Sequence, residues 1–358
     1  MSRSLRVWVL SDGKPGHVNQ ARGLVRRIAG LRDVEHQEHR VQLRWRLLRP
    51  LMRWALNQRK SWASRLVRHA YVSLPIFSEP PDLIVSAGGN TSYASAVLAR
   101  DLGVNNFFMG SLRGLDAALF NTVFSLQPLL DRQGETLPNN AVLPILPPDS
   151  DPAQSNAEVQ LLRERYPHSK IGAVLVGGDG SGYRFTNADW QNLAVAMNAL
   201  SQQYDVVWLL TTSRRSGANA EAILKRLLLP EAIAEAVWYQ QDARNRNDVF
   251  LHAADFVLCG EDSMSMLHEA LAADAPVVSL APQEARPPVR YYQKIQQLER
   301  QGYVQRHGIA ELAELNVVTV LSQASKQRPD WRVALDELLR PLLDAVDSAQ
   351  ASNESVSE

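Results

Sequence analysis

The stretch "LCGEDSMSMLHEALAADAPVVSL", residues 258 to 280, contains a complete strand, turn, helix and strand in sequence. An apolar run ends at Cys259, and residues 260–262 are typical of a turn. Apolar residues then recur at helical spacing from Met266 to Leu271, and Ser263 or Ser265 could cap this helix. A second apolar run, Val277–Leu280, predicts the next strand. This βαβ unit is the building block of a parallel sheet covered by helices.

The same alternation of short apolar runs and helix-length segments continues along most of the chain. One helix is indicated after the first strand, where Val18, Ala21, Leu24, Val25 and Ile28 share a face. The other predicted strands are Leu5–Leu10, Leu83–Ser86, Asn106–Met109, Val123–Ser125, Ile171–Val176, Val206–Thr211 and Val257–Cys259.

A Pro-, Asp- and Ser-rich stretch, "LPILPPDSDPAQSNAE" at residues 143 to 158, divides the chain into similar halves. Each half opens with an apolar run and a glycine turn, "RVWVLSDGKPG" and "IGAVLVGGDGSG". We therefore expect an α/β protein with two doubly wound Rossmann-like domains facing a cleft, into which the carboxyl ends of the strands point. The expected boundaries are 1–150, 151–325, and 326–358 for a C-terminal helix and disordered tail.

Composition excludes several classes of protein. Lys plus Arg and Asp plus Glu both number 38, so net charge indicates no polyanionic partner. The single cysteine, Cys259, excludes an internal disulfide framework. The first apolar run is too short for a signal peptide, and no run approaches the roughly 18 apolar residues of a membrane span. We expect a cytoplasmic protein.

The segment of residues 40–69 is basic and aromatic. It holds nine Arg or Lys, no acid, and Trp45, Trp54 and Trp62. A helical pair with a solvated basic face would explain the charges, but such a face usually includes acids. The composition favours contact with an anionic membrane surface. No nucleic-acid motif accompanies the segment, and we expect no nucleic-acid partner. The arginines expected at the membrane are Arg44, Arg46, Arg49 and Arg53.

Glycine turns after several strands are candidate ligand loops. "SDGKPGHVNQ" is either an ordinary turn, with Gly13 and Gly16 at positive φ, or an anion or substrate loop at a helix N-terminus. "SAGGNTSYASAV", residues 86–97, is a similar loop in the same half, and Thr91 or Ser92 could cap its helix. The candidate residues of this half are Asp12, Lys14, Gly16, His17, Asn19, Gly88, Gly89, Asn90 and Arg113.

The second half carries features suited to a nucleoside diphosphate. Small residues in "GGDGSGYRF" let a diphosphate approach the backbone, and the arginines of "TTSRRSG" match the geometry of phosphate oxygens. The helix start at Ser263 could hold a diphosphate and Glu269 a ribose, although Glu269 also suits an exposed helix face. The donor-binding candidates are Gly177, Gly178, Ser181, Thr212, Ser213, Arg214, Arg215, Glu261, Asp262, Ser263, Ser265, Met266 and Glu269.

Four stretches together resemble a known family: "SDGKPGHVNQARGL", "VLVGGDGSGYRFT", "LLTTSRRSG" and "EDSMSMLHEALA". They are similar to bacterial relatives of a plant mitochondrial-fission protein family, whose members look like glycosyltransferases with the two-domain B-type fold. The first loop also resembles the Gly-Gly-x-Gly-Gly-His loop of the lipid-II-forming N-acetylglucosaminyltransferase, with His17 at the histidine.

The resemblance implies transfer of a sugar from a nucleotide-sugar donor. The basic, Trp-containing segment is the reason to expect a lipid-linked or cell-envelope glycan acceptor, such as lipopolysaccharide core, at the inner face of the cytoplasmic membrane. His17 would be the base or a phosphate contact, and Asp12 a rival base. No cofactor or metal is expected, since arginine and helix dipoles would hold the leaving group. A nucleotide-sugar 2-epimerase and a non-catalytic membrane-associated interaction protein remain the alternatives.

Overall fold

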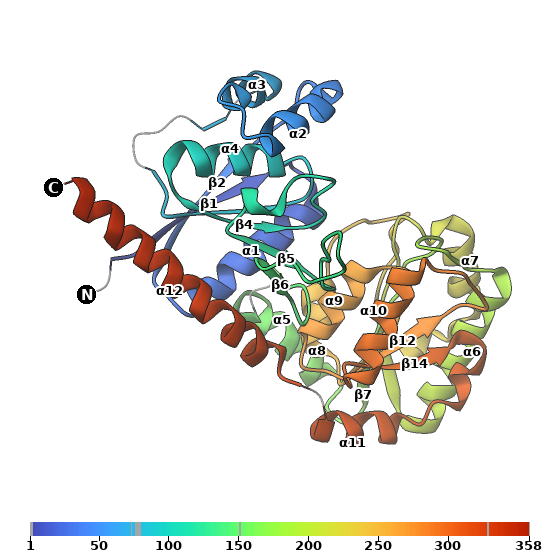
Figure 1. The fold of residues 1–358 in the computed structure, drawn as a ribbon. Coiled ribbons are helices and arrows are strands. Elements are labelled where there is room, and N and C mark those ends of the chain that lie inside the picture. Colours follow the sequence, from blue (N-terminus) through green and yellow to red (C-terminus); the bar gives the residue numbers. More distant parts are fainter. Residues whose placement is uncertain (1–2, 73, 76–79, 150–151, 328, 358) are drawn as a thin grey trace. The chain divides into compact units, whose positions relative to one another are not determined.

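The structure, a computed structural model, describes residues 3–72, 74–75, 80–149, 152–327 and 329–357. The chain forms two compact units (Figure 1). The first comprises Met1–Asp149 and Asp330–Glu358, and the second Ser150–Pro329. The residues from Asp330 onward therefore group with the first unit, whereas the sequence suggested a separate C-terminal segment. The predicted cleft stays a prediction.

The first unit is built on a six-stranded parallel sheet in the order β2-β1-β3-β4-β5-β6. Helices α1 and α4 pack beside this sheet, α3 packs against α4 and α2 against α3, and the long helix α12 runs along the unit (Figure 1). The strands are β1 (Leu5–Ser11), β2 (Val34–Arg40), β3 (Leu83–Ala87), β4 (Asn105–Met109), β5 (Thr122–Ser125) and β6 (Asn140–Val142). The helices are α1 (Pro15–Ala29), η1 (Arg46–Leu48), α2 (Arg49–Asn57), α3 (Ala63–Ala70), α4 (Ser92–Leu102), η2 (Ala117–Leu119) and α12 (Trp331–Ser357).

Two helices of this unit show how the apolar pattern is used. The predicted face of α1 is confirmed, because all five of its apolar residues are buried. Helix α12 buries Leu335, Leu339 and Leu343 at four-residue spacing. Arg27 of α1 donates from Nε to Asp336 at 2.5 Å, so α12 is held to the unit by both apolar packing and an ion pair.

The second unit contains a six-stranded parallel sheet in the order β10-β9-β7-β11-β12-β14 and a two-stranded antiparallel pair, β13-β8. The strands are β7 (Lys170–Leu175), β8 (Tyr183–Arg184), β9 (Val206–Thr211), β10 (Ile233–Val237), β11 (Phe256–Gly260), β12 (Val277–Ala281), β13 (Glu284–Ala285) and β14 (Val304–Gly308). The helices are α5 (Pro152–Arg165), α6 (Asn187–Tyr204), α7 (Gly217–Leu227), η3 (Pro230–Ala232), α8 (Asn247–Ala253), α9 (Met264–Ala272), α10 (Val289–Arg300), η4 (Ile309–Glu314) and α11 (Val317–Gln327).

The α/β class and the two doubly wound sheets are confirmed. In the first unit β1 and β3 are neighbours, and the chain leaves β1 for β2 on one side and β3 for β4 on the other. In the second unit β7 and β11 are neighbours, and the chain continues from β7 to β9 on one side and from β11 to β12 on the other. These positions are topological switch points, where the loops after neighbouring strands diverge and leave a crevice at the carboxyl edge. The fold thus singles out the loops after β1, β3, β7 and β11.

Candidate functional site

The crevice of the first unit joins the loops after β1 and β3. Asp12 follows β1, His17 lies in the first turns of α1, and Asn90 follows β3. His17 Nδ1 lies 3.1 Å and 3.2 Å from the two carboxylate oxygens of Asp12, and Asn90 Nδ2 donates to Asp12 Oδ2 at 3.0 Å. The structure therefore brings three of the predicted residues into one hydrogen-bonded cluster.

Burial distinguishes the two members of the Asp12–His17 pair. The Asp12 side chain is only 3% exposed, whereas that of His17 is 30% exposed. A carboxylate can only accept, so Nδ1 carries the proton and donates to Asp12, and Nε2 is the ring nitrogen with a lone pair. This geometry places Asp12 where it can orient the ring, and its expected role as a rival base stays a prediction.

The glycines of the β3 loop make room for this cluster. Gly88 has φ +86°, and a Cβ there would lie 2.5 Å from Cγ of His17. A Cβ at Gly89 would lie 2.9 Å from Nε of Arg113. Any side chain would displace the histidine or the arginine. In the first loop Gly13 has φ +75°, but Gly16 lies inside α1 and is not a positive-φ residue, so that expectation was wrong.

The remaining candidates of this unit differ in accessibility. Lys14 and Asn19 are exposed. The hydroxyl of Thr91 donates to the carbonyls of Ala87 and Gly88, at 2.9 Å and 2.8 Å, and caps no helical N–H group. Arg113 is exposed and has φ +48°. Lys14 and Asn19 are thus open to a ligand, whereas Thr91 is part of the scaffold.

The basic segment forms η1, α2 and α3, and it is amphipathic. Met52, Leu56 and Val67 are fully buried. Its opposite face exposes large apolar side chains between cations, with Lys60 lying over the ring of Trp54. The exposed apolar residues are Trp45, Leu47, Leu51, Trp54 and Trp62. Arg44, Arg46 and Arg53 are exposed, but Arg49 is half-buried and donates to Asn90 Oδ1 at 2.5 Å.

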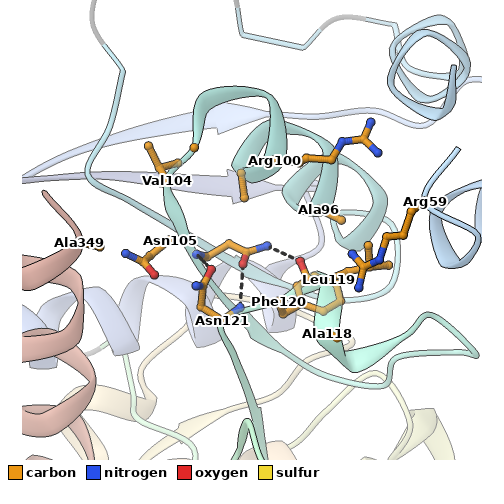
Figure 2. A pocket seen from close by; sticks show the side chains of 13 residues that line it. Arg59, Ala96, Arg100, Val104, Asn105, Ala118, Leu119, Phe120, Asn121 and Ala349 are labelled. Atoms are coloured by element: carbon orange, nitrogen blue, oxygen red, sulfur yellow. Dashed lines mark hydrogen bonds between the residues drawn. The ribbon is translucent and has the colours of Figure 1, made fainter. Parts of the chain in front are cut away.

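A cavity of about 520 Å³ lies at the amino end of β4 in this sheet (Figure 2). It is bordered by the end of α4, the start of β4, η2 and Ala349 of α12. Asn106 and Asn121 pair there through backbone N–H groups and side-chain oxygens, at 3.0 Å and 2.9 Å. These amides join β4 to the residue that precedes β5. The cavity therefore lies at the amino ends of the strands, whereas the loops after β1 and β3 lie at the carboxyl ends.

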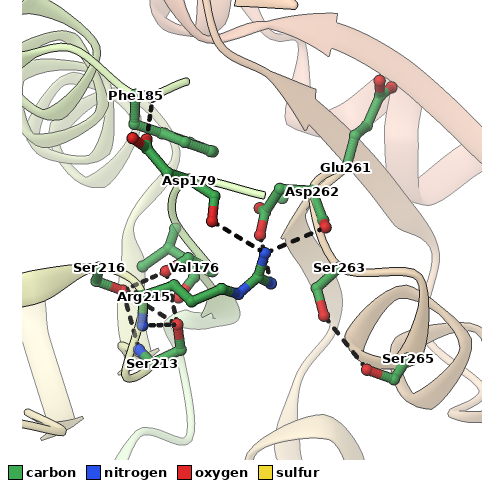
Figure 3. Close-up of polar contacts among 12 residues, drawn as sticks. Val176, Asp179, Phe185, Ser213, Arg215, Ser216, Glu261, Asp262, Ser263 and Ser265 are labelled. Atoms are coloured by element: carbon green, nitrogen blue, oxygen red, sulfur yellow. Dashed lines mark hydrogen bonds and ion pairs between the residues drawn. The ribbon is translucent and has the colours of Figure 1, made fainter. Parts of the chain in front are cut away.

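In the second unit Arg215 joins three loops (Figure 3). Its guanidinium lies 2.6 Å from Asp262 Oδ2, and its Nη1 donates to the backbone oxygens of Asp179 and Asp262, each at 3.4 Å. Ser213 Oγ donates to the carbonyl of Gly177 at 2.6 Å. The loops after β7, β9 and β11 are thus tied together at the switch point.

The glycines after β7 are needed for this arrangement. A Cβ at Gly177 would lie 2.6 Å from Cγ of Asp262, and one at Gly178 would lie 2.7 Å from the nitrogen of Ser216. Burial raises the pKa of Asp262 to about 6, and the nearby Arg215 counteracts this effect. Arg215 therefore stabilises a buried carboxylate, whereas the sequence proposed it for phosphate.

Glu261 also has an internal role, although the sequence placed it among the donor-binding residues. Its side chain is fully buried. It accepts hydrogen bonds from Arg306 Nε at 2.7 Å, Ser279 Oγ at 2.9 Å and Tyr183 Oη at 3.1 Å. Tyr291 Oη donates to its carbonyl at 2.6 Å. Burial raises the pKa of both tyrosines, so their hydroxyls remain donors. This network fixes the end of β11.

Helix α9 places the other donor-side candidates. Ser263 stands at its N-cap without a capping hydrogen bond from its side chain, and its Oγ lies 3.3 Å from that of Ser265. Glu269 accepts from Asn247 Nδ2 at 3.0 Å, and burial raises the pKa of Glu269. Thr212 is buried and donates to Glu221. Arg214 is exposed and has no ion-pair partner in the described part of the chain, and Ser181 and Met266 are at least partly exposed.

Two kinds of feature are absent from the described residues. No three His, Cys, Asp or Glu side chains within the described ranges are grouped so that they could hold a metal ion. No helix in the same ranges is both long enough and apolar enough to cross a bilayer.

Comparison with known proteins gives a family and a fold. The family described as Mitochondrial fission ELM1 matches residues 15–328. The structure of MurG from Acinetobacter baumannii is similar, with 13% identity and a TM-score of 0.50 over 94% of this chain and 99% of that chain. The glycotransferase of kitacinnamycin has 14% identity and a TM-score of 0.50 over 99% of each chain.

A UDP-GlcNAc 2-epimerase from Neisseria meningitidis bound to UDP-GlcNAc is as similar, with 9% identity and a TM-score of 0.51 over 97% of this chain and 100% of that chain. Curated proteins include no significant sequence match. The structural neighbours establish the B-type glycosyltransferase fold, which transferases and epimerases share. The choice between these activities must come from the site.

Proposed function

The chain belongs to the Mitochondrial fission ELM1 family, and from this premise we propose that it is a glycosyltransferase. The proposed reaction moves a sugar from a nucleotide-sugar donor to a lipid-linked or cell-envelope glycan acceptor, such as lipopolysaccharide core. The proposed place of reaction is the inner face of the cytoplasmic membrane, with the protein bound peripherally.

The observation that carries this proposal is the Asp12–His17 pair at the switch point of the first unit. Transfer requires a base for the acceptor hydroxyl, and a histidine whose Nδ1 donates to a buried carboxylate presents Nε2 for that purpose. Asp12 also stabilises the imidazolium that forms when the proton arrives. The acceptor oxygen bonds to the anomeric carbon, the bond from that carbon to the phosphate oxygen breaks, and its electron pair leaves with the nucleoside diphosphate.

The leaving diphosphate needs positive charge, and we assign that to the second unit. The free N–H groups at the start of α9 and the exposed guanidinium of Arg214 supply it. Arg215 is paired with Asp262 and acts by holding the loops. Glu269, fixed by Asn247, suits a ribose hydroxyl. On this scheme the charge is held without a metal ion.

The 2-epimerase alternative is less well supported by the carboxylates. Proton shuttling at a sugar carbon needs acidic groups that can reach the sugar. In the second-unit crevice, Glu261 is enclosed by Tyr183, Ser279 and Arg306, and Asp262 is ion-paired and fully buried. A scaffold without activity would not require the oriented histidine.

The membrane part of the proposal rests on the exposed face of η1, α2 and α3. Exposed Trp and Leu side chains between cations suit the interface of an anionic bilayer, where aromatic rings insert and arginines meet phosphates. A lipid-linked acceptor would be found at such a surface.

Thermal unfolding in the presence of nucleoside diphosphates and nucleotide sugars tests the donor site. A ligand at one hundred times its Kd stabilises the folded state by about 2.7 kcal/mol. We expect Arg214→Ala to weaken this effect and Arg226→Ala, an exposed arginine of α7, to leave it unchanged. If no nucleotide or nucleotide sugar stabilises the protein, both the transferase and the epimerase are refuted.

Transfer assays with a binding donor and lipopolysaccharide or lipid-linked acceptors test the base. We expect His17→Ala to abolish transfer and retain donor binding, with His36→Ala on β2 as the matched control. Loss of donor binding in His17→Ala would instead make His17 a phosphate contact. Release of an epimerised sugar nucleotide without an acceptor would favour the epimerase.

Vesicle flotation tests the membrane contact. We expect binding to vesicles containing anionic lipid, a weaker response in the double variant Arg44→Glu, Arg46→Glu, and no change in Arg226→Glu. Equal flotation of all three proteins would refute the proposed membrane surface.

A further inference from the structure

We propose that Arg49 and Tyr71 are positioning residues that fix the ring orientation and tautomer of His17 through Asn90 and Asp12. The proposal deepens the proposed function, since it rests on His17 being the base. Arg49 is the first residue of α2 and Tyr71 directly follows α3, so neither belongs to the six-stranded sheet.

Arg49 determines which way the amide of Asn90 faces. An asparagine amide has an acceptor oxygen and a donor NH2 group, and it can be rotated to exchange them. Arg49 Nη2 donates to Asn90 Oδ1 at 2.5 Å, so Nδ2 must point to the other side, where it donates to Asp12 Oδ2 at 3.0 Å. If the amide were rotated, its NH2 group would face the N–H groups of Arg49, and its oxygen would face the carboxylate of Asp12. Neither contact would then be a hydrogen bond. One guanidinium thus selects the orientation that Asp12 requires.

Tyr71 holds the backbone of the same residue. Its hydroxyl donates to the carbonyl of Asn90, and the Tyr71 side chain is buried. Burial raises the pKa of Tyr71, so the hydroxyl stays protonated and remains a donor at neutral pH. Asn90 is therefore fixed at its side chain by α2 and at its main chain by the residue after α3.

The effect reaches His17 through Asp12. The Asp12 carboxylate accepts from Asn90 on one oxygen and from the Lys14 backbone N–H, at 3.3 Å, on the other. These donors set the plane of the carboxylate, and that plane places both oxygens within 3.2 Å of His17 Nδ1. The partner of one ring nitrogen decides which nitrogen carries the proton. Without Asn90 in place, Asp12 can turn and the Nδ1–H tautomer loses its support.

Helix α2 also holds the neighbouring loop that carries Arg113. Arg53 Nη1 donates to the carbonyl of Arg113 at 3.2 Å, and Asn57 pairs with the backbone of Gly114 and Asp116, each at 2.9 Å. The same short helix therefore contacts both the loop that carries Asn90 and the loop that carries Arg113. This double contact favours a positioning role for α2 over simple coverage of the sheet.

The test is nuclear magnetic resonance of the His17 ring nitrogens, at a pH where the ring is neutral. In the wild-type protein we expect separate nitrogen signals with the proton on Nδ1. In Arg49→Ala we expect the difference between the two signals to shrink or reverse, and Tyr71→Phe to give a smaller change. Arg49→Lys restores a donor to Asn90 and should recover most of the wild-type spectrum. Arg65→Ala, an exposed residue of α3, is the matched control and should leave the spectrum unchanged.

An unchanged tautomer in both Arg49→Ala and Tyr71→Phe would overturn the proposal. If Arg49→Ala does not fold, Tyr71→Phe decides alone, because it removes only the hydroxyl that donates to the Asn90 carbonyl, and an unchanged tautomer there would overturn the proposal. The spectrum needs no substrate. A tautomer shift without any detectable transfer by the wild-type protein would therefore support the positioning role and count against the proposed transferase.

Discussion

Replacing Gly88 by alanine is expected to disable His17 while leaving the first unit folded. Gly88 has φ +86°, and its Cα faces the imidazole so closely that an added Cβ would lie 2.5 Å from Cγ of His17. Ordinary carbon contacts are near 3.5 Å or longer. Nδ1 is the ring atom nearest to the added Cβ, so the ring must move by about 1 Å or more, and we expect this shift to disrupt the hydrogen bond between Nδ1 and Asp12.

The size of the effect follows from two contributions. A non-glycine residue at positive φ costs about 1–2 kcal/mol. A lost hydrogen bond to a charged group adds about 1.5–3 kcal/mol, so Gly88→Ala should lower the free energy of unfolding by about 2.5–5 kcal/mol. Loss of an oriented general base lowers turnover by about 10²–10⁴-fold.

Gly103 provides the matched control. It has φ +66° at the end of α4, and a Cβ there would meet nothing within 4 Å. Gly103→Ala should therefore show only the backbone contribution, about 1–2 kcal/mol, with full donor-dependent transfer. Urea unfolding gives the free energies, and single-turnover transfer gives the rate.

The reasoning would be refuted if the two variants lost equal stability and kept equal turnover, because the contact with His17 would then have no consequence. Loss of donor binding in Gly88→Ala would also contradict it, since the donor is assigned to the second unit.

Three further predictions concern packing and charge. The pKa of Asp262 is raised from 3.8 to about 6 in the folded state. Its contribution to the free energy of unfolding is therefore present below pH 4 and lost as the pH rises through 6. Urea unfolding across this range should show this loss of stability in the wild-type protein and not in Asp262→Asn. Glu261→Ala leaves the partly buried Arg306 without its carboxylate and should destabilise the second unit by about 3–5 kcal/mol, whereas loss of nucleotide binding at unchanged stability would show that Glu261 contacts the ligand. Leu339→Ala in α12 should destabilise the first unit by about 2–5 kcal/mol, seen as faster hydrogen exchange in α1, and faster exchange in β7 instead would contradict this assignment.

The fold was largely predictable because central strands of parallel sheets are apolar runs. All eight predicted strands are present, most of them longer by a residue or two. In the two six-stranded sheets the missed strands are β2, β6, β10 and β14, and each lies at an edge of its sheet; the short pair β8 and β13 was missed as well. Edge strands are partly solvated and their sequences are polar, as "VEHQEHR" of β2 shows, so they carry no apolar signal.

The candidate site was predictable where a loop follows a strand at a switch point, and less so where a side chain reaches across the fold. The loop glycines, His17 and Asp12 were identified from local patterns. That Glu261 and Asp262 point inward depends on Arg306 and Arg215, which come from β14 and the β9 loop. Arg49 was expected at a membrane because of its neighbours in sequence, whereas its nearest partner, Asn90, is 41 residues away. Local composition carries no information about such a contact.

The return of α12 to the first unit makes that unit a discontinuous domain, with the whole second unit inserted between its two pieces. During synthesis the sheet from β1 to β6 leaves the ribosome long before α12. Arg27 of α1 cannot pair with Asp336 until the chain 309 residues further on has been translated. The second unit, whose residues are contiguous, can fold first. We therefore expect the order of folding to be opposite to the order of the domains in the chain, with the first unit exposed to chaperones in the interval.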